Sequence, residues 1–255
     1  MDDCDLMSRL TTIKYAATVL AALVLSACGG GGDPAPFTVP VTPAGVWKGS
    51  TDAGRDVTTI VLEDGTYYMV YGGATAGSVG GGVQGTGSLA DSAFASATGR
   101  NYNLEGAGTQ AATLAATLAP FDSLDGSVTS TTSGAMAFRT RYSADSIAPA
   151  SLQTLAGDYP GQVTFGLGVR AGVFTITAAG QVSTVINGCS IGGTAAPRAD
   201  VNAFDVTLVF GGAPCVFPGA SFSGIAYQDA EAGTLLSFVR LQAAGQALFF
   251  SGKRS

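Results

Sequence analysis

Short runs of alternating or β-branched apolar residues recur about every 8 to 12 residues from position 44 onward, and Gly, Asp and Asn separate them. A half-buried strand alternates apolar and polar residues with a period of two, whereas an amphipathic helix repeats about every 3.6 residues. No window in this part of the sequence shows a sustained helical period. The pattern therefore predicts an all-β fold, built as an antiparallel meander.

Two hairpins show this pattern most clearly. Residues 58–62 (TTIVL) and 66–71 (TYYMVY) flank an Asp-Gly turn, which supplies the positive φ angles that a tight hairpin needs. Residues 173–177 (VFTIT) and 181–186 (QVSTVI) flank Ala-Ala-Gly in the same manner. Each segment is therefore predicted to form a pair of antiparallel strands.

Several later segments have the same character. In residues 203–210 (AFDVTLVF) the even-numbered positions are all apolar, so one face of a strand would meet the core. Residues 111–118 (AATLAATL) contain alanine and leucine, which favour a helix, but their two threonines lead us to expect a strand. Three further strands would complete the meander, at residues 221–227, 235–241 and 247–250.

The sequence also repeats itself. The segment AGVWKG at residues 44–49 recurs as AGDYPG at residues 156–161, and each copy opens a strand that leads into a hairpin. AFRTR at residues 137–141 is similar to SFVRL at residues 237–241, so the ends of the two halves correspond as well. These two matches predict a duplication.

The duplication divides the body into one β-barrel-like repeat at residues 44–148 and a second at residues 149–255. Each repeat has room for seven or eight short strands, which fits a small closed barrel or half of a larger sandwich. Two architectures are therefore open: tandem small barrels, or one larger barrel or sandwich.

The first repeat resembles the lipocalin (calycin) family, in which an arginine of the last strand packs across the tryptophan of a Gly-x-Trp motif on the first. Trp47 would be that tryptophan, and Arg139 or Arg141 that arginine. In the second repeat Tyr159 replaces the tryptophan, with Arg240 as the candidate arginine. The resemblance implies calycin-like barrels in which Trp47 is a core aromatic.

Residues 1–27 have the composition of an export signal. Arg9 and Lys14 precede an apolar run at residues 15–25, whose 11 residues fall far short of the roughly 20 that cross a bilayer as a helix. We therefore predict a cleaved signal peptide. Because three acids stand among the first five residues, where a signal peptide is normally positive, we favour Met7 over Met1 as the start of translation.

The apolar run ends in LSAC, and this sequence resembles the lipobox of bacterial lipoproteins. The resemblance implies that Cys28 receives diacylglycerol and becomes the first residue once residues 1–27 are removed. The resemblance also implies that the new amino terminus carries a further acyl chain such as palmitate, and two or three chains together anchor a protein lastingly where one holds it only marginally. Residues 28–43 follow with four glycines and four prolines, a composition typical of a tether.

These features predict a lipid-anchored protein of the bacterial cell envelope, at the outer membrane on its periplasmic or surface face. A lipobox before glycine-rich β-structure also resembles, in architecture, the barrel lobes of transferrin-binding-type surface lipoproteins. In such a compartment disulfides form, and the two cysteines of the body, Cys189 and Cys215, are expected to pair. Closing that loop would stabilise the fold by about 3.5 kcal/mol.

The composition excludes several classes of function. None of the 255 residues is histidine, so no Ser-His-Asp triad, imidazole zinc site or His-ligated haem can exist. The formal net charge is −6 and basic residues form no stripe, so nucleic acid is not an expected partner. No metal site or cofactor is predicted.

Other motifs have plainer explanations. Residues 72–87 (GGATAGSVGGGVQGTG) contain Gly-x-Gly-x-x-Gly, but no βαβ unit surrounds it, so we interpret it as a mobile loop or a glycine-softened barrel strand. On the strand that contains Tyr67, Tyr68 and Tyr71, the first and last share one face, so one face is expected to be core. Candidate acids for carboxylate-pair catalysis lack any recognisable context: Glu63, Asp91, Glu105, Asp158, Asp205 and Glu231.

We therefore predict a non-enzymatic binding module, tethered by its lipid anchor, for a small apolar ligand or an envelope protein. The sequence assigns no ligand-binding residues. One alternative is a structural or adhesive surface lipoprotein with solid barrels. The other is a two-carboxylate hydrolase, which requires two acids about 5 to 10 Å apart in a cleft.

Overall fold

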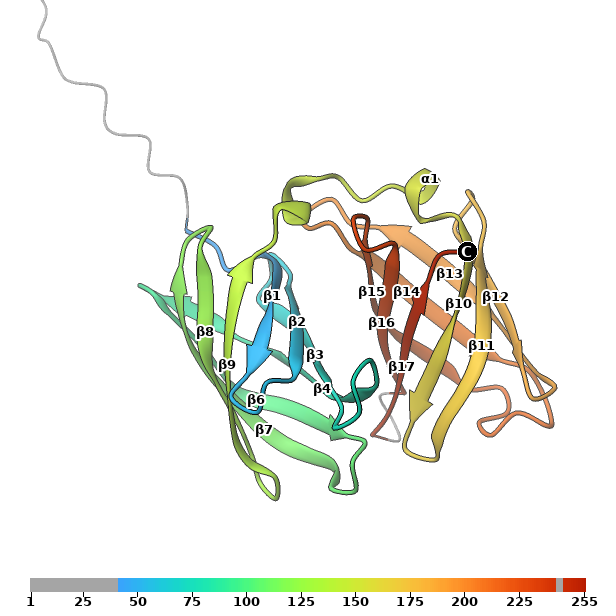
Figure 1. The fold of residues 1–255 in the computed structure, drawn as a ribbon, viewed down its shortest axis with the longest axis horizontal. Helices are drawn as coiled ribbons and strands as arrows, with labels where there is room; N and C mark the ends of the chain where they lie inside the picture. The colour runs from blue at the N-terminus through green and yellow to red at the C-terminus, as the bar shows by residue number, and fades with distance from the viewer. Residues whose placement is uncertain (1–40, 242–244) are drawn as a thin grey trace, which may run out of the picture. The chain divides into compact units, whose positions relative to one another are not determined.

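The computed structural model describes residues 41–241 and 245–255, which form two closed, eight-stranded antiparallel β-barrels in tandem (Figure 1). The predicted all-β class is confirmed, and of the two open architectures the chain adopts tandem barrels. The signal peptide, Cys28 and most of the tether lie outside the described residues, so these stay predictions.

Barrel 1 follows the chain in a simple meander. Its sheet runs in the order β4-β3-β2-β1-β9-β8-β7-β6-β5, and pairing of β4 with β6 closes it. The short β5 (Ser88–Ala90) pairs with β6 alone beside the closure. The eight strands of the ring are β1 (Gly45–Thr51), β2 (Asp56–Val61), β3 (Thr66–Gly72), β4 (Val79–Thr86), β6 (Ala93–Asn103), β7 (Gly108–Ala119), β8 (Ser123–Ser130) and β9 (Gly134–Tyr142).

Barrel 2 repeats this meander without the extra strand, and β10 pairs with β17 to close it. Its strands are β10 (Gly157–Phe165), β11 (Gly168–Ile176), β12 (Gln181–Ile186), β13 (Cys189–Pro197), β14 (Phe204–Phe210), β15 (Ser221–Asp229), β16 (Thr234–Leu241) and β17 (Gln246–Lys253). A one-turn 3₁₀ helix, η1 (Ala144–Ile147), and α1 (Leu152–Leu155) connect the barrels. Over the described ranges, no helix is long and apolar enough to cross a membrane.

The local predictions hold where the pattern was strongest. β2–β3 and β11–β12 are the two predicted hairpins. Residues 111–118 lie within β7, because alternate positions there face a barrel interior that a helix would not fit. The even-numbered residues of β14 are buried and its odd-numbered residues are exposed, as the alternation predicted.

Equivalent contacts support the duplication. Trp47 on β1 and Tyr159 on β10 are both buried, and each donates a hydrogen bond to a carbonyl four residues earlier in the chain. Trp47 Nε1 lies 2.9 Å from the Pro43 oxygen, and Tyr159 Oη lies 2.8 Å from the Leu155 oxygen. Trp47 is therefore the core aromatic that the sequence indicated.

The prediction that Arg139 or Arg141 packs on Trp47, and Arg240 on Tyr159, is wrong. Arg139 and Arg141 alternate with the buried residues of β9 and point to solvent, and the edge of Tyr142 contacts Trp47 instead, with ring centroids 5.0 Å apart. In barrel 2 it is Arg254, not Arg240, whose guanidinium lies over Tyr159, 5.5 Å from the ring centroid. Strand parity decides this, because outward-facing positions cannot reach an inward-facing ring.

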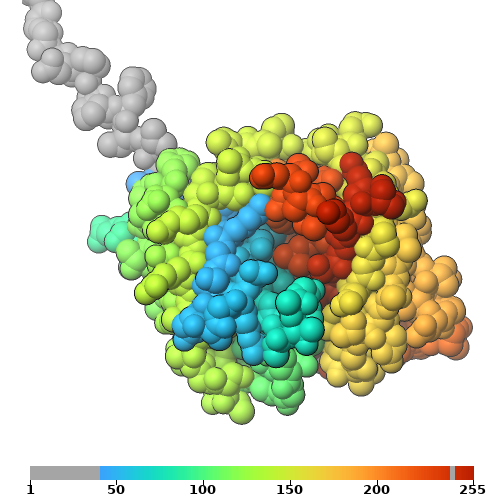
Figure 2. All heavy atoms as spheres, in the orientation of Figure 1, coloured from blue at the N-terminus to red at the C-terminus, as the bar shows by residue number. Residues whose placement is uncertain are grey.

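Each barrel has its own apolar interior, and a third apolar cluster joins the barrels. It buries residues of both: Val46, Ile60, Leu62, Val70, Tyr102, Val201, Ala203, Ile225, Tyr227, Phe238, Ala247 and Phe249. Figure 2 shows the first strands of barrel 1, blue to cyan, against the last strands of barrel 2, in red. The barrels are thus held by a shared core.

The glycine-rich segment at residues 72–87 is explained by this packing. It includes β4, so the interpretation as a softened barrel strand is confirmed for that part. A Cβ on Gly82 would lie 2.6 Å from a ring carbon of Phe249, and one on Gly85 would lie 2.6 Å from the Tyr67 hydroxyl. The glycines therefore admit aromatic rings from both sides of the strand.

Candidate functional site

An apolar hollow of about 290 Å³ opens at one end of barrel 2. It lies where β10, β12 and β14 end and where β11 and β13 begin. Its lining is almost wholly apolar: Val163, Phe165, Leu167, Arg170, Ile186, Asn187, Cys189, Ile191, Phe210, Pro214, Val216, Phe217 and Leu248. A site with this lining favours an apolar ligand, since few groups in it can replace hydrogen bonds to water.

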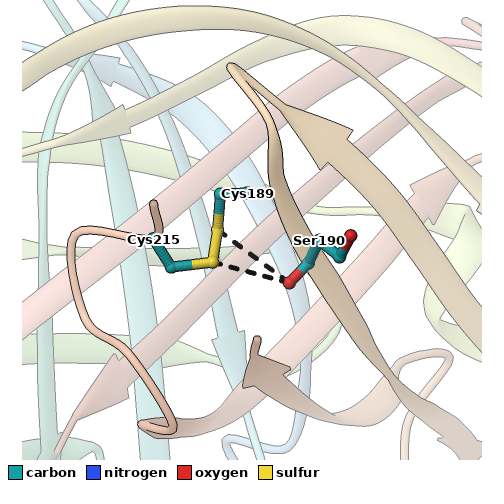
Figure 3. The surroundings of a disulfide bond; sticks show 3 residues. All are labelled: Cys189, Ser190 and Cys215. Carbon is teal, nitrogen blue, oxygen red and sulfur yellow. Dashed lines mark hydrogen bonds between the residues drawn. A yellow bond between two sulfur atoms is a disulfide. The ribbon is translucent and has the colours of Figure 1, made fainter. Parts of the chain in front are cut away.

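The predicted disulfide between Cys189 and Cys215 is present (Figure 3), and Cys189 lines this hollow. Cys189 opens β13 after a tight turn, and Cys215 lies in the loop between β14 and β15. The two sulfurs are bonded and both cysteines are buried. The carbonyl oxygen of Ser190 lies 3.6 Å from Cys215 Sγ and 3.9 Å from Cys189 Sγ, as contacts, because disulfide sulfurs have no hydrogen to donate.

Aromatic side chains close the hollow on the side of the barrel interior. Phe210 contacts both Phe217 and Phe222, with ring centroids 6.1 and 5.1 Å away. Deeper in the barrel the rings of Phe174 and Phe250 pack with centroids 4.6 Å apart, tilted by 52° to one another. The deeper part of the interior retains a void of only about 20 Å³, so the open volume belongs to the mouth of the barrel.

The rim combines exposed apolar residues with one cation. Leu167 and Val216 are more than half exposed. Arg170 donates a hydrogen bond from Nη1 to the carbonyl of Val169, and over residues 41–241 and 245–255 no carboxylate forms an ion pair with it. The guanidinium is thus available to an anionic group at the edge of an apolar site.

A second cluster brings two carboxylates together beside a cleft between the barrels. Asp145 and Asp229 accept hydrogen bonds from Lys48 Nζ at 2.9 and 2.8 Å. Tyr227, a lining residue of the 670 Å³ cleft, also donates to Asp145. No sequence pattern identifies this pair, because its members stand 84 positions apart with no motif around either.

The surroundings lower the pKa of both carboxylates. The Tyr227 hydroxyl and then the Lys48 ammonium hold the pKa of Asp145 below its usual value. Burial raises the pKa of Asp229, but hydrogen bonds from the Ala232 backbone and Lys48 outweigh this effect and lower it. A general acid needs a carboxyl whose pKa is raised. This cluster is therefore better explained as a pair of salt bridges, in which Lys48 of barrel 1 binds Asp229 of barrel 2 and Asp145 of the connecting segment.

The other sequence candidates do not form a site. Tyr67 and Tyr71 face the interior of barrel 1, whereas Tyr68 contacts Phe238 of barrel 2, with centroids 5.6 Å apart. Of the candidate acids, Glu105 pairs with Arg55 and Asp205 with Arg198. In the described part of the chain, no three Cys, His, Asp or Glu side chains gather as a metal ion requires.

Comparison with known proteins does not assign a family. No family model matches the sequence, and no curated protein matches it. The crystal structure of the Myxococcus xanthus hemagglutinin in complex with a3,a6-mannopentaose matches over 83% of this chain and 93% of that chain, with 15% sequence identity and a TM-score of 0.18. A score this low carries no argument, so the interpretation below rests on the geometry of the hollow.

Proposed function

We propose that the protein is a lipid-anchored envelope protein whose second barrel binds a small amphipathic molecule without catalysing a reaction on it. The observation that carries this proposal is the apolar hollow of about 290 Å³ at the mouth of barrel 2. Pockets for drug-sized ligands span about 300 to 1,000 Å³, so a ligand at the lower end of that range is expected.

The chemistry of the rim narrows the ligand class. When an acyl chain enters the hollow, each Å² of its apolar surface that is removed from water contributes about 25 cal/mol of favourable binding free energy. Its carboxylate would then lie at the rim, where Arg170 offers a charge-assisted hydrogen bond. A medium-chain fatty acid such as decanoate combines both properties.

Replacing Leu167 with aspartate tests this site. The new carboxylate removes apolar contact from the rim and repels an anionic ligand, so affinity for decanoate should fall about tenfold, equal to about 1.4 kcal/mol. Isothermal titration with decanoate measures the change. Val185→Asp is the matched control, because Val185 is exposed to a similar extent on β12 without lining the hollow.

Two results would refute the proposal. One is the absence of decanoate binding to the unaltered protein, together with a native mass spectrum free of any apolar molecule. The other is an equal loss of affinity in Leu167→Asp and Val185→Asp. Either outcome would favour the alternative of a structural or adhesive lipoprotein.

The anchor is tested separately at Cys28. Its thiol is the atom that the lipobox resemblance identifies for lipid attachment, and serine cannot be modified in its place. The Cys28→Ser variant is therefore expected to move from the membrane fraction to the soluble fraction of the cell, as an immunoblot would show. A variant that still sediments with the membrane would contradict the lipid anchor while leaving the ligand proposal intact.

A further inference from the structure

Barrel 1 has a hollow at the end that corresponds to the mouth of barrel 2. Its volume is about 210 Å³, and it lies where β1, β3, β6 and β8 end and β9 begins. β1, β3 and β6 occupy the same positions in their ring as β10, β12 and β14 in barrel 2. The two copies thus keep an opening at the same end, and the lining of that opening differs.

A chain of hydrogen bonds crosses the floor of this hollow. Tyr71 Oη on β3 donates to Asn101 Oδ1 on β6 at 2.8 Å, and Asn101 Nδ2 donates to Ser130 Oγ on β8 at 3.0 Å. All three residues line the hollow, and both Asn101 and Ser130 are 5% exposed. In barrel 2 the corresponding strand ends carry apolar residues, among them Ile186 and Phe210.

The chain leaves hydrogen-bonding capacity unused. Among the hydrogen bonds between described residues, the second amide hydrogen of Asn101 and the hydroxyl hydrogen of Ser130 have no acceptor. Gln110, which is similarly buried on the neighbouring β7, also uses both ends of its amide, on residues 132–133. Each of these polar atoms already has one partner within the barrel, and the remaining hydrogens of Asn101 and Ser130 can be donated to a molecule in the hollow that both residues line.

The site is preorganised and uncharged inside. A Cβ on Gly81 would collide with the Tyr71 hydroxyl, so the glycine-rich strand makes room for the ring in this position. Burial raises the pKa of Tyr71 to about 12, so its hydroxyl stays protonated at neutral pH. At the rim, Arg55 and Glu105 form an ion pair and neutralise one another, and Asp52 adds one exposed carboxylate.

We propose that this hollow binds a neutral polyhydroxylated molecule of the size of one sugar ring, held by Tyr71, Asn101 and Ser130. Hydroxyl groups both donate and accept, which matches a floor of amide and hydroxyl groups without net charge. The volume is below that of a typical drug-sized pocket, so a single ring fits it better than an oligosaccharide. The site is independent of the decanoate site in barrel 2.

The test uses four named probes with the full-length protein: D-glucose, D-galactose, D-mannose and N-acetyl-D-glucosamine. Saturation-transfer NMR should detect at least one of them, with a dissociation constant near the millimolar range. Tyr71→Phe should weaken that probe about tenfold, the factor expected for the loss of one hydrogen bond of ordinary strength. Ser130→Ala should weaken it to a similar extent.

Tyr67→Phe is the matched control. Tyr67 lies on the same strand and is equally buried, but its hydroxyl has no hydrogen-bond partner among the described residues and does not line the hollow. Affinity for the sugar should therefore be unchanged in Tyr67→Phe. Affinity for decanoate should be unchanged in all three variants, which separates this proposal from the proposed function.

Three outcomes would overturn the inference. The first is the absence of saturation transfer to any of the four sugars. The second is an equal loss in Tyr71→Phe and Tyr67→Phe, which would mean that the barrel is perturbed and not the site. The third is binding of inorganic phosphate in preference to every sugar, which would mean that the hollow selects an anion.

Discussion

Replacing Phe238 with alanine is expected to lower the free energy of unfolding by about 4 kcal/mol, the usual cost of removing a fully buried aromatic ring. Phe238 lies on the outer face of β16 and has no exposed surface. Its ring contacts Phe249 at 4.5 Å, and Tyr68 and Tyr102 of barrel 1 at 5.6 Å each. Alanine would leave a cavity in the core that the two barrels share.

The measurement can separate the barrels. The only tryptophan of the chain, Trp47, lies in barrel 1, whereas Phe238 lies in barrel 2. Urea denaturation followed by tryptophan fluorescence therefore reports whether a change in barrel 2 destabilises barrel 1. We expect the midpoint of that transition to fall in Phe238→Ala, because the shared core couples the barrels.

Val185→Ala is the control, since this side chain is 65% exposed and its loss should cost no more than about 0.5 kcal/mol. If the tryptophan transition of Phe238→Ala coincided with that of the unaltered protein, the barrels would unfold independently. The shared core would then contribute little to the stability of barrel 1.

The double variant Cys189→Ser/Cys215→Ser is expected to lose about 3.5 kcal/mol of stability. The cysteines are 26 positions apart, and the cross-link restricts the unfolded chain over that loop. The same bond holds residues 211–220 beside the hollow of barrel 2, where Pro214, Val216 and Phe217 form part of the lining. Decanoate affinity should therefore fall as well.

Thermal unfolding and decanoate titration measure the two effects. Reducing the unaltered protein with dithiothreitol should reproduce both, because it breaks the same bond without changing a residue. A double variant that retains full stability and full affinity would show that the loop keeps its place without the cross-link.

Much of the fold could be predicted because strands depend on local alternation. The inward face of β14 followed from a period of two, the hairpin at β2–β3 from its Asp-Gly turn, and the strand at residues 111–118 from its two threonines. The disulfide followed from counting cysteines. The duplicated segment correctly pointed to Trp47 and Tyr159 as equivalent aromatic residues.

Contacts between residues from distant segments of the chain could not be predicted from the sequence. The partner of Tyr159 is Arg254, which follows the last strand, and although strand parity excludes Arg240, no local pattern identifies Arg254. Lys48, Asp145 and Asp229 come from β1, η1 and β15, and they meet only because the two barrels adjoin. Spacing along one strand gives no information about such neighbours.

By itself, the sequence determined the β-class, the repeat and the cysteine pair, because alternation, segment similarity and residue count are properties of the chain. The lipid anchor at Cys28 is a prediction of the same kind, and its test is chemical. Only the tertiary structure decided what covers each face of a strand. Phe238 lies in the core that the two barrels share. The equivalent ends of the barrels have an apolar lining in barrel 2 and a more polar one in barrel 1. Both results depend on tertiary structure, because closing a barrel brings together side chains from strands that are distant in sequence.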